Sequence, residues 1–403
     1  MNRSVPAVVI VRDRASSGGG IYNYYNAITP HMGAAVTLCD AGRPFTFYGD
    51  HRSLVSWLLN FTPTRLLLDW SGLALKIARH RPAVVVVNPC MDPSTFFRSL
   101  RRDAANLLIG RLLGRRILCF WRGWENDCCG KPEFPGGNKS LLCCIYKMAH
   151  AHIVLSERFK QDLLRWNFTT PIHVETTVVE DQCLAGSPVP PGPGKAHTNL
   201  LYLSRVEVAK GVFELLDAFR ILKSRNPAYT LTIGGDGPDL ETLKDYAKQL
   251  ELTDVVFTGF LKGQAKVDCY RQGSVFCFLS YSEGMPNAVL EALAMGLPVV
   301  SSEASGLADI LRDGENGFIV LPDGNAPPKK KFDPQAVADA IERLVETPEL
   351  HERISTINWR YARQRFAAPV VAKRLEAICR SLLSPEPAGS GRTSKPVKPV
   401  CVE

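Results

Sequence analysis

The sequence contains no run of about 18 apolar residues, so it predicts no helix that crosses a membrane. The first apolar stretch, AVVIV at residues 7–11, is too short for the core of a signal peptide, and we expect a cytosolic protein. The 12 cysteines lack C-x-x-C spacing, which argues against a zinc site. Without an export signal they predict reduced, mostly buried thiols and not a disulfide framework.

A dinucleotide-binding fingerprint is also lacking. The segment IGGDGPDLETL, residues 233–243, places three glycines at a turn between a strand and a helix. It is not G-x-G-x-x-G, and no suitably placed acid follows it. We therefore expect no dinucleotide cofactor, and the chain as a whole predicts no nucleic-acid partner.

Charge is unevenly distributed along the chain. Residues 1–190 hold 22 basic and 14 acidic side chains, whereas the remainder holds 26 of each, so the whole net charge of +8 lies in the first half. A cluster of arginines stands at residues 98–116. It is explained either as the solvated face of a helix or as a surface that attracts an anionic membrane or a phosphorylated substrate.

The length and the alternation of elements predict two doubly wound α/β domains. A chain of 403 residues is too long for one ordinary core. Strands are expected at residues 7–11, 83–88, 116–121 and 152–156, and again at 199–204, 229–235, 255–259, 274–280 and 297–302, with helices between them. The predicted divisions are a first domain at 1–184, a Pro/Gly linker at 185–197, a second domain at 198–366, a C-terminal helix at 367–384 and a disordered tail at 385–403.

The segment YSEGMPNAVLEALAMG, residues 281–296, lies between two of these strands. Pro286 suits a helix start and Asn287 a cap, so Glu283 stands in a loop at the carboxyl edge of the sheet and Glu291 about one turn inside the helix. Ligands bind at that edge in open α/β sheets. The two acids therefore predict a site for a polyhydroxylated, partly anionic ligand, although pairs of glutamates are often only solvated.

Basic residues and glycines follow other strands at the same expected edge. Arg205 and Lys210 come after a strand and before a helix start, which suits a diphosphate. The glycine loop at residues 16–20, with Gly19 and Gly20 before a helix, suits an anion or forms a tight turn without a ligand. Gly259 ends a strand, and backbone groups there would contact the edge of a nucleobase.

These motifs together resemble the group 1 (family 4) retaining glycosyltransferases. SEGMPNAVLEALAMGLPVVSSEASGLADILRDGENGFIV, residues 282–320, resembles the family signature, SRVEVAKG at 204–211 the diphosphate motif, and GGI at 19–21 the N-terminal glycine loop. The resemblance implies a GT-B fold of two Rossmann-like domains across a cleft. It also implies a hexosyltransferase that takes a sugar from a nucleotide-sugar donor, with no obligatory metal or other cofactor because basic groups and helix dipoles neutralise the diphosphate.

The resemblance also implies a role for each site residue. Glu283 would lie against the donor sugar as the catalytic residue, Glu291 would hold the ribose hydroxyls, and Arg205 and Lys210 would hold the diphosphate. The donor site would further include the backbone of Gly284, Met285, Pro286, Asn287 and Ala288. The acceptor would be a glycan, in polysaccharide biosynthesis or on a lipid. An anionic membrane surface is a further candidate partner because of the basic residues in the first half of the chain.

The acceptor side departs from the family pattern. Many members carry a histidine where this chain reads CFWRGWEND, and Arg122 stands at that position, with Glu125 close by. Both are candidates for acceptor contacts or for structural roles. The alternatives are a sugar-nucleotide epimerase of the same fold and a relative that only binds a nucleotide sugar. A glycosidase is disfavoured because it would not need Arg205 and Lys210.

Overall fold

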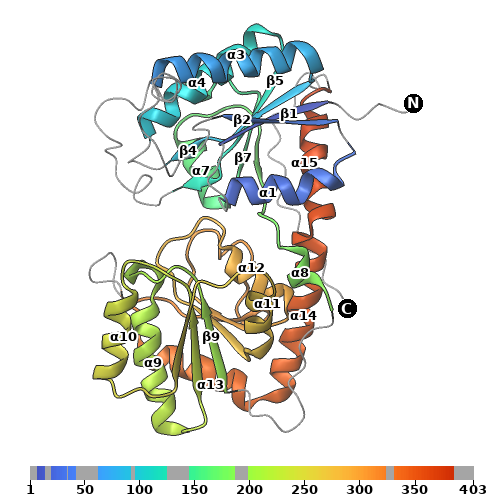
Figure 1. Cartoon of the computed structure of the whole chain (residues 1–403). Helices are drawn as coiled ribbons and strands as arrows, with labels where there is room; N and C mark the ends of the chain where they lie inside the picture. The colour runs from blue at the N-terminus through green and yellow to red at the C-terminus, as the bar shows by residue number, and fades with distance from the viewer. Residues whose placement is uncertain are drawn as a thin grey trace.

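The structure, a computed structural model, describes residues 7–13, 20–33, 35–41, 62–91, 96–124, 145–186, 198–323 and 331–384. They form two α/β units, drawn one above the other in Figure 1, each built on a six-stranded sheet. Gly19, Glu125, most of the predicted linker and the predicted tail lie outside the described residues.

All strands of the N-terminal sheet are parallel, in the order β2-β1-β3-β5-β7-β8. The four residues of β3 are all valine and all buried, as expected for a parallel sheet covered on both faces. The strands are β1 (Val8–Asp13), β2 (Val36–Ala41), β3 (Val84–Val87), β5 (Arg116–Phe120), β7 (Ala151–Val154) and β8 (Ile172–Val174). Beside this sheet β4 (Cys90–Met91) pairs with β6 (Gly123–Trp124).

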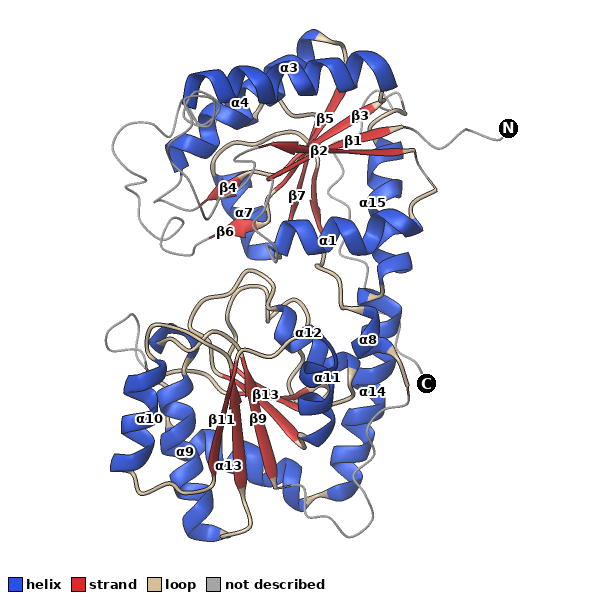
Figure 2. Cartoon of the chain, in the orientation of Figure 1, coloured by secondary structure: helices blue, strands red, loops and turns tan. Residues whose placement is uncertain are grey.

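Helices cover both faces of this sheet (Figure 2). Because side chains alternate along a strand, Val9 and Val85 pack under one layer and Val8 and Val84 under the other. The first layer consists of α3 (Thr62–His80), α4 (Phe96–Leu112) and α7 (Glu157–Arg165). The second consists of α1 (Gly20–Ile28) and α15 (Ala368–Ser381), and the short helix η1 (Thr29–His31) follows α1 directly.

The C-terminal sheet has the same doubly wound form, with parallel strands in the order β11-β10-β9-β12-β13-β14. Its strands are β9 (Asn199–Leu203), β10 (Thr230–Gly234), β11 (Val255–Gly259), β12 (Val275–Phe278), β13 (Val299–Ser301) and β14 (Gly317–Ile319). Its helices are η2 (Val208–Lys210), α9 (Val212–Arg225), α10 (Leu240–Gln249), α11 (Gly263–Gln272), α12 (Asn287–Ala294), α13 (Pro334–Glu346) and α14 (Pro348–Phe366).

The chain passes between the two units twice. It leaves the N-terminal unit through α8 (Asp181–Leu184) and returns from α14 into α15. The two passages are bonded to each other: Val179 N donates to Phe366 O at 3.1 Å, and Arg374 Nε binds Glu175 at 2.8 Å. A helix from the end of the chain therefore completes the core of the N-terminal sheet.

The nine predicted strands are located within two residues of their observed bounds, but β2, β8 and β14 of the two large sheets and the short strands β4 and β6 were not predicted. The helix α14, 19 residues long, was not predicted as a separate element. Asn287 was predicted as the cap of α12, but Pro286 occupies the cap position and no side chain caps the helix. None of the helices in the described ranges is long and apolar enough to cross a bilayer.

Candidate active site

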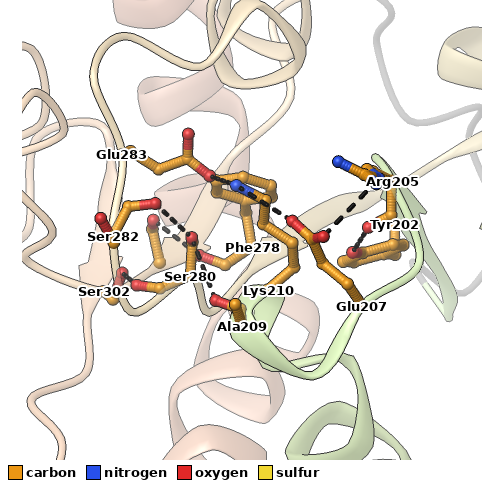
Figure 3. A network of polar contacts seen from close by, with 11 residues as sticks. Tyr202, Arg205, Glu207, Ala209, Lys210, Phe278, Ser280, Ser282, Glu283 and Ser302 are labelled. Atoms are coloured by element: carbon orange, nitrogen blue, oxygen red, sulfur yellow. Dashed lines mark hydrogen bonds and ion pairs between the residues drawn. The ribbon is translucent and has the colours of Figure 1, made fainter. Parts of the chain in front are cut away.

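Two loops of the C-terminal unit bring a lysine and a glutamate together at the carboxyl edge of the sheet. Lys210 ends η2 after β9, and Glu283 lies in the loop between β12 and α12. Lys210 Nζ donates to Glu283 Oε1 at 2.7 Å (Figure 3), and the two side chains are only 18% and 11% exposed. The predicted diphosphate-binding and catalytic residues are therefore direct neighbours.

A glycine allows these two loops to approach so closely. Gly211 has a φ of 65°, and a Cβ at this position would stand 2.2 Å from the carbonyl oxygen of Leu279. Across the same contact Tyr281 N donates to Ala209 O at 3.0 Å. A larger residue at position 211 would push the loops apart and separate Lys210 from Glu283.

Glu207 continues the polar chain from Lys210 to Arg205. Its carboxylate lies 3.8 Å from Lys210 Nζ and 3.6 Å from Arg205 Nε, as Figure 3 shows. The Arg205 side chain is 67% exposed, so its guanidinium is open to a ligand, and its backbone carbonyl accepts from the Tyr202 hydroxyl at 2.9 Å. Four charged side chains therefore line up in alternating sign along the sheet edge.

Glu291 belongs to a second cluster on the same side of the unit. It lies on α12 and is 7% exposed. Two side chains of α11 hold its carboxylate: Lys266 Nζ donates to Oε1 at 2.8 Å and the Tyr270 hydroxyl donates to Oε2 at 3.0 Å. Lys266 also lies 3.1 Å from Glu180, at the passage between the units. Burial raises the pKa of the Glu291 carboxyl, an effect that the ammonium of Lys266 opposes.

A cavity of about 1020 Å³ opens over this edge and reaches both units. From the N-terminal unit, Asn23 of α1 lines the cavity. The aromatic ring of Phe260, which is 66% exposed, forms part of the cavity wall. Its cationic lining consists of Arg205, Lys262 and Lys266. A volume of this size fits a drug-sized or nucleotide-sized ligand.

The structure brings some predicted donor-site residues to this cavity and places others beside it. Arg205, Ala288 and Glu291 line the cavity, whereas Lys210 and Glu283 are joined to it through Glu207 and Arg205. Gly259 at the end of β11, Asn287 at the start of α12, and the loop residues Gly284, Met285 and Pro286 belong to the same unit but are not part of the cavity lining. Gly20 begins α1.

The loop with Gly284 also contacts the N-terminal unit. Met285 packs against the hydrophobic cores of both units. At the N-terminus of α7, Glu157 N donates to Asp309 at 2.8 Å. A Cβ on Gly306 would stand 1.6 Å from Gly284 O, so glycine is needed there for the close packing of the loop. The segment predicted to contact the donor is thus fixed from both sides.

Arg122, the acceptor-side candidate, is packed among aromatic rings at the end of β5. Its guanidinium carbon lies 3.8 Å from the ring centroid of Tyr24 and 5.0 Å from that of Phe120. Nη2 donates to Thr177 Oγ1 at 3.0 Å, while the buried Nη1 has no hydrogen-bond partner in the described part of the chain. Burial lowers the pKa of this guanidinium.

Sequence reasoning missed Lys266, Tyr270 and Glu180, which surround Glu291. Lys266 and Tyr270 are four residues apart and therefore lie on one side of α11. Charged and aromatic residues at this spacing are common on solvated helices, so the sequence carried no signal that they face a cavity. Glu180 lies outside every motif, and only the path between the units brings it to the site.

Comparison with known families gives a match within the C-terminal part of the chain. Residues 192–359 match the model of the family described as glycosyl transferases group 1. That range contains β9 to α13 and most of α14, and with them both lysine–glutamate pairs.

Curated relatives are similar over part of their length. The capsular polysaccharide biosynthesis glycosyltransferase CapM of Staphylococcus aureus is 28% identical over 183 residues, 45% of this chain and 46% of the relative. The alpha-monoglucosyldiacylglycerol synthase of Streptococcus pneumoniae is 30% identical over 182 residues, 44% of this chain and 39% of the relative. This chain thus matches less than half the length of each.

The similarity to solved structures extends over almost the whole chain. The crystal structure of HepE of Anabaena in complex with UDP superposes with a TM-score of 0.68 and 15% identity, covering 93% of this chain and 100% of that chain. The likeness shows the fold: two Rossmann-like units in the GT-B arrangement, as the sequence predicted.

Proposed function

Because residues 192–359 match the group 1 model, we propose that the protein is a retaining hexosyltransferase that moves a sugar from a nucleotide-sugar donor to a glycan acceptor. The observation that carries the proposal is the pair Lys210–Glu283, at 2.7 Å, beside a cavity lined by Arg205 and Glu291. Cationic groups for a diphosphate and carboxylates for the hydroxyls of sugar and ribose then lie along one sheet edge.

In this reaction the bond between the anomeric carbon and the diphosphate oxygen breaks, and a bond to an acceptor hydroxyl forms. Negative charge grows on the leaving diphosphate, and the acceptor hydroxyl passes its proton to an oxygen of that departing diphosphate. Lys210 has three N–H donors, so it can keep Glu283 and still donate to a phosphate oxygen. Arg205 offers a forked guanidinium to the same diphosphate. Both cations stabilise the charge that develops in the transition state.

The two glutamates are proposed to bind opposite ends of the donor. Glu283, fixed by Lys210, would accept hydrogen bonds from the sugar next to the bond that breaks. Glu291 would accept from the ribose hydroxyls, and the exposed ring of Phe260 offers an apolar wall for the base. The backbone of residues 284–288 completes the site.

We propose further that the acceptor is carried on a lipid and that the protein binds the cytoplasmic face of a membrane peripherally. One relative is named for capsular polysaccharide biosynthesis and another for synthesis of monoglucosyldiacylglycerol. The helices α3 and α4 pack side by side over the N-terminal sheet, on the side away from the C-terminal unit (Figure 1). Six of the twelve strongly exposed large apolar residues of the described chain belong to them and the following turn: Leu67, Leu68, Leu75, Leu108, Leu112 and Leu113.

This surface, called the α3–α4 face below, combines apolar and basic groups. Leu75 is 69% and Leu112 76% exposed, while Arg79 and Arg116 are exposed at its end. Leucines that enter the headgroup region and arginines that attract anionic lipids are the features of a peripheral membrane surface. Arg102, a basic residue of the predicted cluster, instead binds the buried Asp103 at 3.0 Å and is structural.

The experiment that tests the transfer reaction measures nucleotide release and product together. The protein is screened for thermal stabilisation by UDP, GDP and ADP, because a ligand at about 100 times its Kd stabilises the fold by ~2.7 kcal/mol. The corresponding nucleotide sugars are then incubated with and without glycan acceptors. Release that requires the acceptor, with a product of unchanged anomeric configuration by NMR, supports the proposal. Conversion of the donor without acceptor would favour an epimerase.

A further inference from the structure

Lys266 makes two ion pairs inside the cavity, and no motif of the chain includes it. Its ammonium lies 2.8 Å from Glu291 Oε1 and 3.1 Å from Glu180 Oε1, and the side chain is 16% exposed. Glu291 is on α12 and Glu180 precedes α8 on the passage between the units. Lys266 therefore joins the carboxylate of the proposed ribose site to the segment that connects the two halves of the chain.

Because Glu291 is buried, its ion pair with Lys266 affects the pKa of its carboxyl group. The carboxylate is almost fully buried, and burial raises its pKa because the charged form loses water. Lys266 opposes this by its charge and its hydrogen bond, and Tyr270 by a hydrogen bond, whereas Glu180 raises the pKa further. The thiol of Cys183, on α8, is the other titratable group that interacts with Glu291.

The carboxylate keeps acceptor capacity for a ligand. An ionised carboxylate has about four lone-pair sites, and Lys266 and Tyr270 use one on each oxygen. Glu291 and Lys266 both line the cavity, so the remaining sites are available to hydroxyl groups there. If the carboxyl were protonated, it would lose one acceptor site and the negative charge that strengthens such bonds.

We propose that Lys266 is a positioning residue that keeps Glu291 ionised and oriented for a vicinal diol, which by the proposed function is the ribose of the donor. The bond to Glu180 orients the ammonium from the other side. Because Glu180 is 49% exposed, this second bond is the weaker of the two. Replacing Glu180 should therefore change donor binding less than replacing Lys266.

The ion pair between Lys266 and Glu291 determines how nucleotide affinity should change with pH. With Lys266 present, burial raises the pKa of Glu291, but the ammonium limits the rise and the carboxyl stays ionised to a lower pH than burial alone would allow. Without it, burial acts unopposed by a cation, the pKa of Glu291 rises, and the group becomes neutral at a higher pH. Nucleotide affinity of a variant without the ammonium should therefore fall with decreasing pH where the unaltered protein shows little change.

The first test needs no ligand. The titration of Glu291 is followed by NMR on protein with ¹³C-labelled glutamate, with the signal assigned by Glu291→Gln. Lys266→Met and Lys266→Gln should both raise the pKa of Glu291, since neither carries a charge, and Lys266→Arg should restore it. Lys244→Met is the matched control, because Lys244 binds Glu241 at 2.7 Å on the exposed side of α10. An unchanged Glu291 titration in folded Lys266→Met or Lys266→Gln overturns the proposal.

The second test measures UDP, GDP and ADP binding by calorimetry from about pH 5 to about pH 8. For the nucleotide that binds best, Lys266→Met should weaken affinity by ~10–150-fold at the acidic end, the value of a bond to a charged group, and by less at the basic end. Lys266→Arg and Lys244→Met should follow the unaltered protein. Equal weakening at every pH would overturn the role in ionisation. A raised Glu291 pKa with no binding of any nucleotide would instead contradict the proposed function and leave the ionic coupling supported.

Discussion

In the C-terminal unit Lys210 and Lys266 each bind a glutamate, at 2.7 and 2.8 Å. In the N-terminal unit the partly buried Arg122 lies 3.8 Å from the ring centroid of Tyr24 and donates to a hydroxyl. Nothing in the described residues pairs its Nη1. The C-terminal unit thus holds these two lysines in ion pairs, whereas Arg122 of the N-terminal unit contacts no carboxylate among the residues that the structure describes.

This difference has a physical consequence for ligand binding. A lysine already paired with an acid is fixed in place and can share its remaining N–H donors with a phosphate at little cost in side-chain entropy. A partly buried guanidinium without an acid remains costly in free energy until an anion reaches it. We therefore expect a donor side that is organised in advance and an acceptor side whose charge balance changes when the acceptor binds.

The largest effect should come from Lys210. Lys210→Ala removes the cation next to the departing diphosphate, and loss of one such contact lowers kcat by about 10²–10³-fold. Arg205→Ala should act in the same direction with a smaller loss, because Arg205 is 67% exposed. Acceptor-dependent nucleotide release measures both, with Lys244→Ala as a surface control. Near-normal turnover of Lys210→Ala would remove the motif from the site.

Glu283→Gln should lower catalysis without weakening nucleotide binding, and so test which end of the donor Glu283 contacts. It keeps the size of the side chain and removes the charge that pairs with Lys210 at 2.7 Å. We expect kcat to fall by about the same 10²–10³-fold as for Lys210→Ala, with nucleotide affinity retained. Steady-state kinetics together with calorimetry on the free nucleotide decides the point. Loss of nucleotide binding would place Glu283 at the ribose instead.

Glu291→Gln should show the opposite pattern. Its effect falls on nucleotide binding, because the ribose hydroxyls lose a charged acceptor worth about 1.5–3 kcal/mol. The amide would also leave Lys266 without its closest acid. Calorimetry should give a weakened Kd, and kcat at saturating donor should change less than in Glu283→Gln. If affinity is kept and kcat collapses, the two glutamates have exchanged roles.

The proposed donor-site residues could be predicted from the sequence, but the contacts between them could not. On the donor side, buried strands and the loops after them follow from local composition, and Arg205, Lys210, Glu283 and Glu291 stand in motifs of fixed spacing. The contact between Lys210 and Glu283 requires two loops 73 positions apart, and the residue that permits it is Gly211. The motif predicted both partners at one sheet edge but not their direct bond.

The other features depend on tertiary contacts without a sequence signature. Lys266 and Glu180 meet Glu291 only because the passage between the units lies beside α11. Arg122 was located from a motif, but its packing against Tyr24 depends on α1 crossing β5. Gly19 and Glu125 lie outside the described residues, so their predicted roles remain predictions.

On the N-terminal side, Arg122→Met should test whether the partly buried cation serves the acceptor. Methionine keeps the apolar packing against Tyr24 and removes the charge. We expect kcat/KM for the acceptor to fall about 10-fold, the lower value for a hydrogen bond to a charged group, with unchanged nucleotide affinity. Arg122→Lys should recover part of the loss. If donor and acceptor constants are both unchanged while only the melting temperature falls, the role is structural.

The smallest effects should be those of the α3–α4 face, where each side chain contributes separately to membrane binding. Sedimentation with vesicles of anionic or neutral phospholipid is the measurement, at low and high salt. We expect binding to anionic vesicles that weakens with salt, because the field of a charged surface is screened over about 8 Å at physiological ionic strength. Arg79→Gln and Arg116→Gln should each lower affinity by ~5-fold, or about 1 kcal/mol.

Leu75→Ser and Leu112→Ser should give similar losses at all salt concentrations, because insertion of an apolar side chain is not an ionic effect. Leu321→Ser is the matched control, since Leu321 is 60% exposed on the C-terminal unit, away from this face. Equal binding to neutral and anionic vesicles would show that the arginines are not the attracting groups. No binding at low salt, or equal losses for Leu321→Ser, would contradict the membrane role and favour a soluble acceptor.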